Sequence, residues 1–417
     1  MNSFYFHNKA LHVESVLVAD LMGEYGSPLY IYSKSQIEFN WKQFKDSFGV
    51  HPHLICYAVK ANSNLAVLNV LANLGSGFDI VSIGELERVI AAGGDPKKCV
   101  FSGIAKTEYS IQKALEYGIY CFNVESEAEL DRIESVAASL KMNAPISIRV
   151  NPNVDAKTHP YISTGLTENK FGVGADLALS LYKKANLSDC LEVFGLDYHI
   201  GSQITDISPF LEALDKALEL ITKLGNDKIY LNHIDIGGGV GVTYDKETTI
   251  SINDYISSVI QKVGNLKIMV EPGRSIVGNA GIFVTKVEYL KQNELKSFAI
   301  VDGAMNDLLR PALYGSYHQA VTIEDNLKGK KDSWDIVGPI CETTDFLAKN
   351  RSLILEQGDY IALMTAGAYG FVLSSNYNSR PRVAEVMVDG SAHQLVRMRE
   401  TTESLFKNEM ILKDEIN

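Results

Sequence analysis

A single lysine stands at the end of an apolar, strand-like run in the hexapeptide Tyr57-Ala58-Val59-Lys60-Ala61-Asn62. A lysine with its ordinary pKa of about 10.4 belongs in water, so one placed where a buried strand ends needs an explanation. A desolvated lysine becomes a neutral amine, which can form a Schiff base with an aldehyde. The alternative is that Lys60 caps the strand and reaches solvent.

Further ionisable or glycine-rich groups stand in or just after other strand-like runs of the chain. They are Asp79, Asn123, Arg149, His199 with Ser202, Gly237, Gly238 and Gly239, and Glu271 with Gly273 and Arg274. If the runs are parallel strands of one barrel, their carboxyl ends meet at a single rim, where such barrels place their active sites. We therefore expect these groups to share one site with Lys60.

Short β-branched or aromatic runs alternate with amphipathic segments from about residue 54 to 273. Strands are expected at 54–60, 78–82, 99–102, 120–124, 145–150, 195–199, 231–236 and 267–270, and helices at 83–92, 110–117, 126–140 and 210–224. Eight such units in one uninterrupted array are typical of a (β/α)8 TIM barrel. Two doubly wound halves are the alternative arrangement.

The pattern changes after residue 280, where strand-like runs follow one another with little helix between them. They span 281–289, 297–301, 320–323, 335–337, 360–364 and 382–388, and a further strand at 29–32 precedes a helix at 34–48. We expect an α/β barrel at 34–280, a sandwich-like or barrel-like all-β domain at 281–417, and an N-terminal segment, 1–33, packing with that β domain. The polar loop 151–174 is long enough to be a lid.

The glycines and Glu271 together indicate a cofactor with a phosphate and a basic ring. Glycines after the seventh strand of a barrel let backbone N–H groups approach a phosphate closely, and Arg274 follows the eighth. A buried carboxylate, Glu271, would suit the protonated ring nitrogen of pyridoxal phosphate. The alternatives are that Glu271 pairs with Arg274, that Arg149 pairs with Asp79, and that His199 is a satisfied rim residue rather than a ring that stacks on the cofactor.

Composition bounds the class of protein. The chain has 417 residues, 46% of them hydrophobic and 22% charged, with a net charge of −12, which argues against a general nucleic-acid surface. The five cysteines show no paired spacing, so neither a disulfide framework nor a metal site is indicated, and a reduced, cytoplasmic protein is expected. Neither a signal peptide nor an apolar stretch of membrane-spanning length is apparent.

Taken together, these motifs resemble the fold type III pyridoxal-phosphate-dependent basic amino-acid decarboxylases. The resemblance is carried by 57–62, His199-Ile200-Gly201-Ser202-Gln203, Gly237-Gly238-Gly239, Glu271-Pro272-Gly273-Arg274 and Cys341-Glu342, with support from 306–314 and Ala368-Tyr369-Gly370. It covers about residues 25 to 400 and is closest to the members that convert meso-diaminopimelate to lysine and CO₂. Small departures, such as Gly303-Ala304 where the family often has Ala-Gly, remove no charged group.

The resemblance implies a role for each matched residue. Lys60 would hold the cofactor, His199 would stack on its ring and Glu271 would meet the ring nitrogen, with Asp79 and Arg149 also at the cofactor. The phosphate end would be surrounded by Ser202, Gly237, Gly238, Gly239, Gly273, Arg274 and Tyr369. The distal carboxylate of the substrate would meet Arg274, Arg310 and Tyr314, and its distal amino group Glu342, with Tyr369 nearby. Cys341 would donate a proton and, with Glu342, would cross the interface of a homodimer.

The charges of the candidate side chains support the same substrate. Diaminopimelate carries a carboxylate and an ammonium group at its far end, and Arg310 with Glu342 offers one partner for each. A decarboxylase that makes a diamine would hold only an ammonium group, beside which an arginine is unfavourable. The alternatives are a decarboxylase of ornithine, arginine or carboxynorspermidine, an alanine-racemase-like enzyme, and an inactive homologue that only binds or regulates.

Overall fold

The computed structural model describes residues 3–155, 169–325 and 328–412. The chain divides into two compact units, one spanning Gln36–Asn279 and the other combining the residues up to Ser35 with those from Ala280 onward. The predicted lid at 151–174 has its central part, 156–168, outside the described residues. No helix in the described part of the chain is long and apolar enough to cross a membrane.

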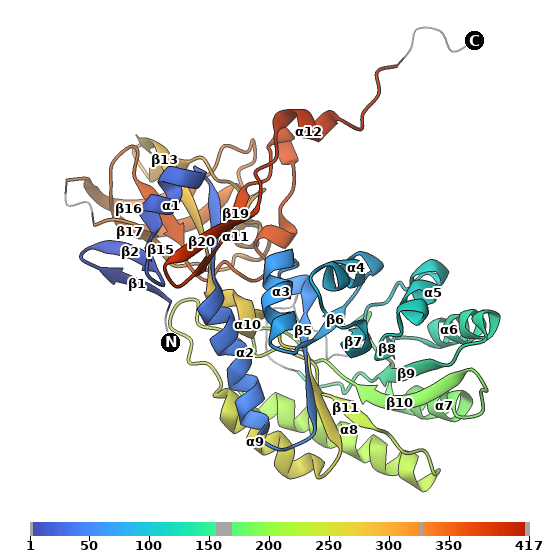
Figure 1. Ribbon diagram of the computed structural model, residues 1–417. Helices are drawn as coiled ribbons and strands as arrows, with labels where there is room; N and C mark the ends of the chain where they lie inside the picture. The colour runs from blue at the N-terminus through green and yellow to red at the C-terminus, as the bar shows by residue number, and fades with distance from the viewer. Residues whose placement is uncertain (1–2, 156–168, 326–327, 413–417) are drawn as a thin grey trace. The chain divides into compact units, whose positions relative to one another are not determined.

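The first unit contains a closed barrel of eight parallel strands (Figure 1). In chain order the strands are β5 (His53–Ala58), β6 (Gly77–Ile80), β7 (Cys99–Phe101), β8 (Cys121–Val124), β9 (Ala144–Arg149), β10 (Leu191–Asp197), β11 (His233–Asp235) and β12 (Lys267–Val270). Pairing of β12 with β5 closes the ring. The predicted (β/α)8 barrel is thus confirmed, and the doubly wound alternative is wrong.

The helices of the barrel are α2 (Lys34–Phe48), α3 (Leu65–Asn73), α4 (Ile83–Ala91), α5 (Glu108–Tyr117), α6 (Glu127–Leu140), α7 (Ala175–Ala185), α8 (Ser208–Asn226), α9 (Ile252–Val263) and the short α10 (Arg274–Val277). Five of the helices in this part of the chain, α3, α4, α5, α6 and α9, begin where a short polar side chain satisfies a free backbone N–H group. Ser82 caps α4 by accepting a hydrogen bond from the N–H of Glu85, and Ser126 and Ser251 cap α6 and α9 in the same way. An acidic residue three positions after each of these serine caps complements the positive end of the helix.

The barrel interior is packed by thiols, aliphatic groups and one unusual histidine. Cys56 and Cys121 lie in a cluster with Val100 and Met269, and burial raises the pKa of both thiols well above its ordinary value. His233, the first residue of β11, is 0% exposed, and neither ring nitrogen has a hydrogen-bond partner among the described residues. Its ring lies against Gly195, where an added Cβ would stand 2.2 Å from it.

The second unit is built on sheets with little helix. The N-terminal β1 (Phe4–His7), β2 (Ala10–Val13) and β3 (Val16–Leu17) form a small antiparallel sheet, and a nine-stranded sheet contains β4 (Leu29–Ser33), β13 (Gly281–Gln292), β14 (Ser297–Val301), β15 (Ala320–Thr322), β16 (Lys330–Val337), β17 (Phe346–Leu355), β18 (Tyr360–Leu363), β19 (Ala384–Asp389) and β20 (Ala392–Arg397). The helices of this unit are α1 (Val18–Tyr25), α11 (Arg310–Tyr314) and α12 (Thr402–Phe406).

β4 lies inside the larger sheet, where it pairs with β13 on one side and β19 on the other. All five of its residues are buried. β1–β3, β17 and β20 were not predicted from the sequence. β17 has Lys349, Asn350 and Arg351 at its centre, so its apolar alternation is interrupted.

Candidate active site

Lys60 lies one short turn beyond the end of β5. The predicted strand 54–60 was too long, because Val59–Ala61 turn into a 3₁₀ helix, closed by a hydrogen bond from the N–H of Asn62 to the carbonyl of Val59. The Lys60 side chain is 37% exposed and forms an ion pair with Asp79, whose side chain is fully buried at the end of β6. The other carboxylate oxygen of Asp79, Oδ1, has no hydrogen-bond partner among the described residues.

Arg149, the last residue of β9, pairs with two other carboxylates. Its Nη1 lies 3.0 Å from Oε1 of Glu125, and its Nε lies 3.8 Å from Oδ2 of Asp197. Its guanidinium also lies over the ring of Phe171. The ion pair of Arg149 with Asp79 that the sequence left open is therefore replaced by pairs with Glu125 and Asp197, while Asp79 serves Lys60.

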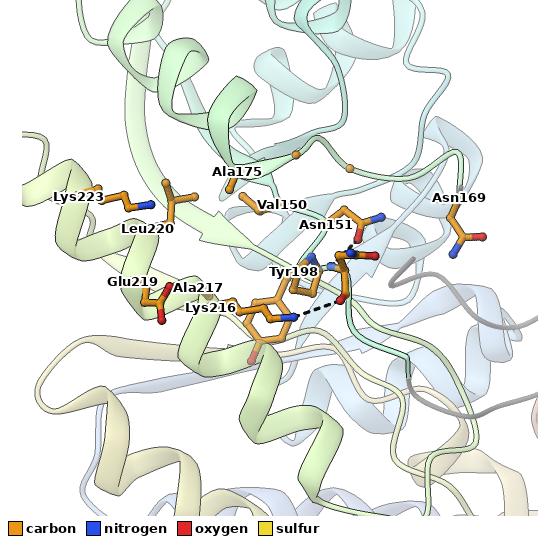
Figure 2. A pocket seen from close by; sticks show the side chains of 14 residues that line it. Val150, Asn151, Asn169, Ala175, Tyr198, Lys216, Ala217, Glu219, Leu220 and Lys223 are labelled. Carbon is orange, nitrogen blue, oxygen red and sulfur yellow. Dashed lines mark hydrogen bonds between the residues drawn. The ribbon is translucent and has the colours of Figure 1, made fainter. Parts of the chain in front are cut away.

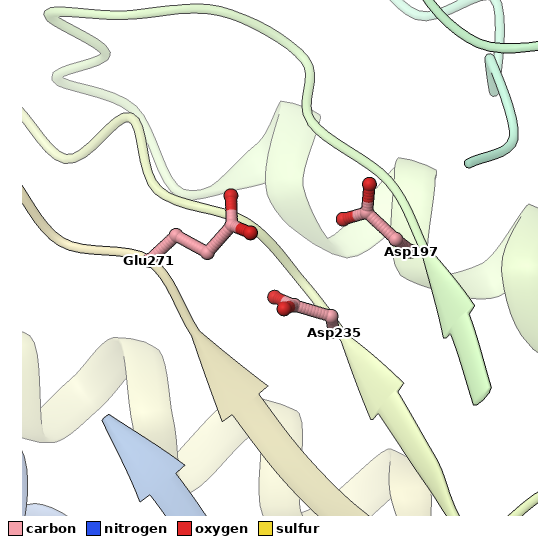
Figure 3. Close-up of side chains that lie close together, drawn as sticks. All are labelled: Asp197, Asp235 and Glu271. Carbon is pink, nitrogen blue, oxygen red and sulfur yellow. The ribbon is translucent and has the colours of Figure 1, made fainter. Parts of the chain in front are cut away.

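Three buried carboxylates converge where β10, β11 and β12 end (Figure 3). Asp197 ends β10, Asp235 ends β11 and Glu271 follows β12, and one oxygen from each lies within 4.8 Å of the others. Desolvation and mutual repulsion raise the pKa of Asp197 and Glu271 well above the ordinary range and that of Asp235 to about 7. Burial and repulsion among these carboxylates therefore favour their protonated forms at the barrel rim.

Glu271 faces polar partners from the opposite strands. Its Oε1 lies 3.5 Å from the hydroxyl of Ser102 and 3.4 Å from Nδ2 of Asn123, and these two side chains also bond to each other. Both distances are long for hydrogen bonds. Glu271 is thus held loosely by neutral donors, and the weak contacts leave it able to accept a stronger donor.

His199 is held neutral by the glycine loop. Its Nδ1 lies 3.2 Å from the backbone nitrogen of Gly238, which can only donate, so Nδ1 is an acceptor and carries no proton. Desolvation, with Arg149 and Lys60 nearby, lowers the pKa of His199 well below its usual value. A neutral, half-buried imidazole at this rim presents a flat face without adding charge.

The glycines of the predicted phosphate loop are required by close backbone packing. A Cβ on Gly237 would lie 2.6 Å from the carbonyl oxygen of Tyr198, one on Gly238 would lie 2.2 Å from that of Glu271, and one on Gly239 would lie 2.5 Å from that of Gly201. Gly237 and Gly239 also have φ of +65° and +113°, which side chains rarely adopt. The loop is therefore a bare backbone surface of the kind that binds phosphate.

Arg274 begins α10 beside this loop. Its Nη2 donates to the hydroxyl of Ser202 at 3.0 Å and its Nη1 to the hydroxyl of Tyr244 at 2.7 Å. The guanidinium is buried, and these bonds to two hydroxyl groups fix its position beside the glycine loop. Gly273 precedes it and would meet Ala61 and Ala58 at 3.0 and 3.1 Å if it carried a Cβ, which brings α10 against the turn that carries Lys60.

A cavity of about 340 Å³ lies between α8 and the segments that follow β9 and β10 (Figure 2). It is lined by the segment after β9, including Asn151 and Asn153, and by Lys216, Glu219 and Lys223 of α8. The amine of Lys216 donates to the backbone carbonyl of Asn153 at 3.1 Å. The cavity borders the predicted lid on both sides of the residues that the structure leaves undescribed.

The remaining predicted residues belong to the second unit. Arg310 is buried in α11 and its Nη1 lies 2.9 Å from Nε2 of His318, whose Nδ1 lies 2.9 Å from the carbonyl oxygen of Met364. Since the carbonyl can only accept, His318 donates from Nδ1 and accepts the Arg310 bond at Nε2. Tyr314, at the other end of α11, is half-buried. Arg310 thus keeps its charge while its position is fixed by a neutral histidine.

Cys341 and Glu342 lie on an exposed turn of this unit. The backbone N–H of Cys341 donates to Oδ1 of Asn378, and the hydroxyl of Tyr377 donates to Oε1 of Glu342 at 2.6 Å. Tyr369 has a φ of +53°, a conformation that few residues other than glycine adopt. Such strained backbone often accompanies a functional position.

Several residues of the site were missed from the sequence. Asp197 and Asp235 fell inside predicted strands, Glu125 followed one, and Tyr244 and His318 stood in unassigned loops. A carboxylate inside an apolar strand of a barrel is itself a signal, because its burial needs a reason. Tyr244 and His318 carry no comparable signal, since only the folded chain brings them to their arginines.

Comparison with known proteins places this geometry in a family. Residues 34–278 match the pyridoxal-binding domain of the pyridoxal-dependent decarboxylases. The chain is 53% identical to the diaminopimelate decarboxylase of Vibrio cholerae, covering 98% of this chain and 99% of that one. The crystal structure of diaminopimelate decarboxylase from Helicobacter pylori, complexed with L-lysine, is 44% identical with a TM-score of 0.90, covering 94% of this chain and 99% of that one. The enzyme from M. jannaschii, in co-complex with L-lysine, is 34% identical with a TM-score of 0.93, covering 98% of each chain. The chain therefore belongs to the diaminopimelate decarboxylases, within the pyridoxal-dependent decarboxylase family.

Proposed function

We propose that this protein removes CO₂ from meso-2,6-diaminopimelate to give L-lysine, the last step of lysine biosynthesis, with pyridoxal 5'-phosphate as its cofactor. The carrying observation is the barrel rim, where one lysine, one bare glycine loop and one loosely held buried glutamate stand at the ends of β5, β11 and β12. A family whose relatives are diaminopimelate decarboxylases over nearly their full length supports the same activity.

The residues at the rim fit this cofactor. Asp79 Oδ1, Asp197 Oδ1 and Asp235 Oδ2 are buried oxygens without hydrogen-bond partners among the described residues, so the rim has capacity for further donors. We propose that Lys60 holds the cofactor through Nζ, Glu271 meets its ring nitrogen, His199 covers its ring, and Asp79 and Arg149 complete the charged surroundings. Ser202, Gly237, Gly238, Gly239, Gly273, Arg274 and Tyr369 are proposed to surround its phosphate.

When bound, pyridoxal phosphate supplies an electron sink for the negative charge that develops at Cα as CO₂ leaves. Asp79 orients the amine of Lys60 through the ion pair between them. Glu271, if ionised, favours a protonated ring nitrogen and so strengthens the sink. A neutral His199 limits the positive charge near the ring, because it adds none itself.

Substrate selection is proposed to rest on Arg310, Tyr314, Glu342 and Tyr369, with Arg274 also in reach of a carboxylate. Arg310 is charged, buried and fixed by His318, which suits it for bidentate recognition of a distal carboxylate. Glu342 would take the distal ammonium group, and Cys341 Sγ would deliver a proton to Cα after CO₂ departs.

We further propose a homodimer in which Cys341 and Glu342 serve the partner's site. Both are exposed on the isolated chain, which supports this assignment. The domain boundaries expected from the sequence, 1–33, 34–280 and 281–417, and a cytoplasmic location remain part of the proposal.

The decisive assay offers the purified protein and cofactor meso-diaminopimelate, ornithine, arginine, carboxynorspermidine and alanine, and measures CO₂ and products. Lysine formation from diaminopimelate alone is the expected result. A diamine or polyamine product would favour the broader decarboxylase, D-alanine the racemase-like enzyme, and no turnover the inactive homologue.

A second measurement tests the site independently of turnover. Borohydride reduction of the loaded protein followed by peptide mapping should place the cofactor on the peptide containing Lys60. Attachment to any other lysine would overturn the site assignment even if lysine is produced.

A further inference from the structure

The proposed function assigns no role to Asp235, a buried carboxylate. It is 0% exposed, and its Oδ1 accepts a hydrogen bond from the N–H of Gly237 at 2.9 Å. Its other oxygen, Oδ2, is buried and has no hydrogen-bond partner among the described residues. An ionised carboxylate with one unsatisfied oxygen in the interior is costly, so Asp235 needs either a cation or a proton.

The cations of the rim are engaged with other carboxylates. Lys60 pairs with Asp79, and Arg149 pairs with Glu125 and Asp197. Asp235 instead has Glu271 as a close neighbour, with one oxygen of each within 4.8 Å (Figure 3). Two carboxyl groups this close in a buried site do not both ionise, and they titrate as a pair.

We propose that Asp235 and Glu271 share one proton in a hydrogen bond between their carboxyl groups, so that the pair carries one negative charge. A protonated ring nitrogen opposite Glu271 would favour the charge on Glu271 and the proton on Asp235, which makes Asp235 a positioning residue. Its Oδ1 orders the glycine loop through Gly237 while its Oδ2 sets the charge of Glu271. One side chain thus couples the phosphate end of the site to the ring end.

Some neighbouring groups raise the pKa of Asp235 and Glu271, and others lower it. Asp79 from β6 and Asp197 from β10 favour protonation, as does burial, while Lys60 after β5 and the Gly237 N–H favour the ionised form. Cys56 and Cys121 also lie within electrostatic range, as do Tyr198 and Tyr255. The balance raises the pKa of Asp235 to about 7 and that of Glu271 well above its ordinary value.

Infrared difference spectroscopy of the cofactor-free protein tests the proton directly. The wild type at pH 6 should show the carbonyl band of a buried carboxylic acid, sensitive to deuterium, that Asp235→Asn removes. Glu271→Gln should remove the same band, because the pair shares a single proton. Absence of the band from the wild type, or its retention in either variant, overturns the proposal, as does its removal by added Mg²⁺ or Ca²⁺, which would indicate a cation site.

The loaded enzyme gives a second readout. The asparagine in Asp235→Asn keeps an acceptor for Gly237 and a donor for Glu271 but has no proton to titrate, so the pH dependence of kcat/KM through neutrality should flatten relative to the wild type. The change of cofactor absorbance with pH through neutrality should disappear. A variant that loses activity but keeps the wild-type absorbance titration would refute the charge-setting role. The orientation toward the ring nitrogen rests on the proposed function, whereas the infrared band is measured without cofactor or substrate and fails or succeeds separately.

Discussion

His233 makes the barrel sensitive to acid, and its contribution can be worked out. Burial is the main reason that the pKa of this imidazole falls to about 3 in the folded chain, against about 6.5 when unfolded. The unfolded chain therefore binds a proton below pH 6.5 that the folded chain refuses until about pH 3. This stability is fully present above pH 6.5 and is lost as the pH falls, by about 2 kcal/mol at pH 5 and about 4 kcal/mol at pH 3.

Replacing His233 measures its contribution to the pH dependence of stability. His233→Leu should flatten the pH dependence of unfolding, so that the wild type loses about 2 kcal/mol more than the variant between pH 7.5 and pH 5. Urea unfolding can be followed through Trp41 of α2 in a Trp334→Phe background, because the chain has only two tryptophans. Only the change with pH is compared, so a cost of the substitution at neutral pH does not affect the result.

A second variant separates the effect of losing the titrating imidazole from the effect of altered packing around it. Phe194 contacts His233 with ring centroids 5.6 Å apart, and Phe194→Leu alters the same cluster without removing a titrating group. This variant should keep the wild-type pH dependence. Parallel curves for His233→Leu and the wild type, agreeing within about 0.5 kcal/mol from pH 7.5 to 5, would refute the reasoning.

Three further predictions follow from the site and its support. Lys106→Met removes three hydrogen bonds of 2.7–2.8 Å from a buried amine, including one to a buried carboxylate, and should cost about 3–5 kcal/mol in denaturant unfolding. Gly238→Ala forces a Cβ against a backbone carbonyl and should abolish cofactor binding measured by absorbance, whereas Gly225→Ala in α8 meets nothing within 4 Å and should stabilise by about 0.5–1 kcal/mol. Cys341→Ala should slow turnover with the cofactor spectrum intact while Cys190→Ala leaves both unchanged; loss of the cofactor from Cys341→Ala would mark that thiol as structural.

The barrel was predictable because its periodicity is local. The strand-like runs are apolar and bounded by polar turns, and several of the following helices open with a cap such as Ser82 or Ser126, so both signals lie within a few residues. Boundaries were less accurate. β10 begins at Leu191 rather than at 195, because a register shift between Val193 and Gly195 breaks the pattern that marks a strand.

The site was predictable only where chemistry stands at a strand end. Lys60, Glu271 and the glycines fall at such positions, and their convergence at the barrel rim follows from the fold. The partners of Arg149 could not be deduced, because Glu125 and Asp197 come from different strands and their competition with Asp79 is decided by geometry. The same holds for His318, which reaches Arg310 only once α11 has formed.

The position of β4 inside the large sheet has a consequence for how the protein is made. A ribosome makes this strand before the other strands of its sheet, and its partner β19 emerges roughly 350 residues later, which at typical synthesis rates is some 20–70 seconds. Until β13 emerges, the five residues of β4, which are buried in the folded chain, have no partner strand, while the barrel strands that follow β4 can already pair in order. The nascent chain should therefore engage chaperones through its first forty residues, and release from the ribosome should precede completion of the sheet.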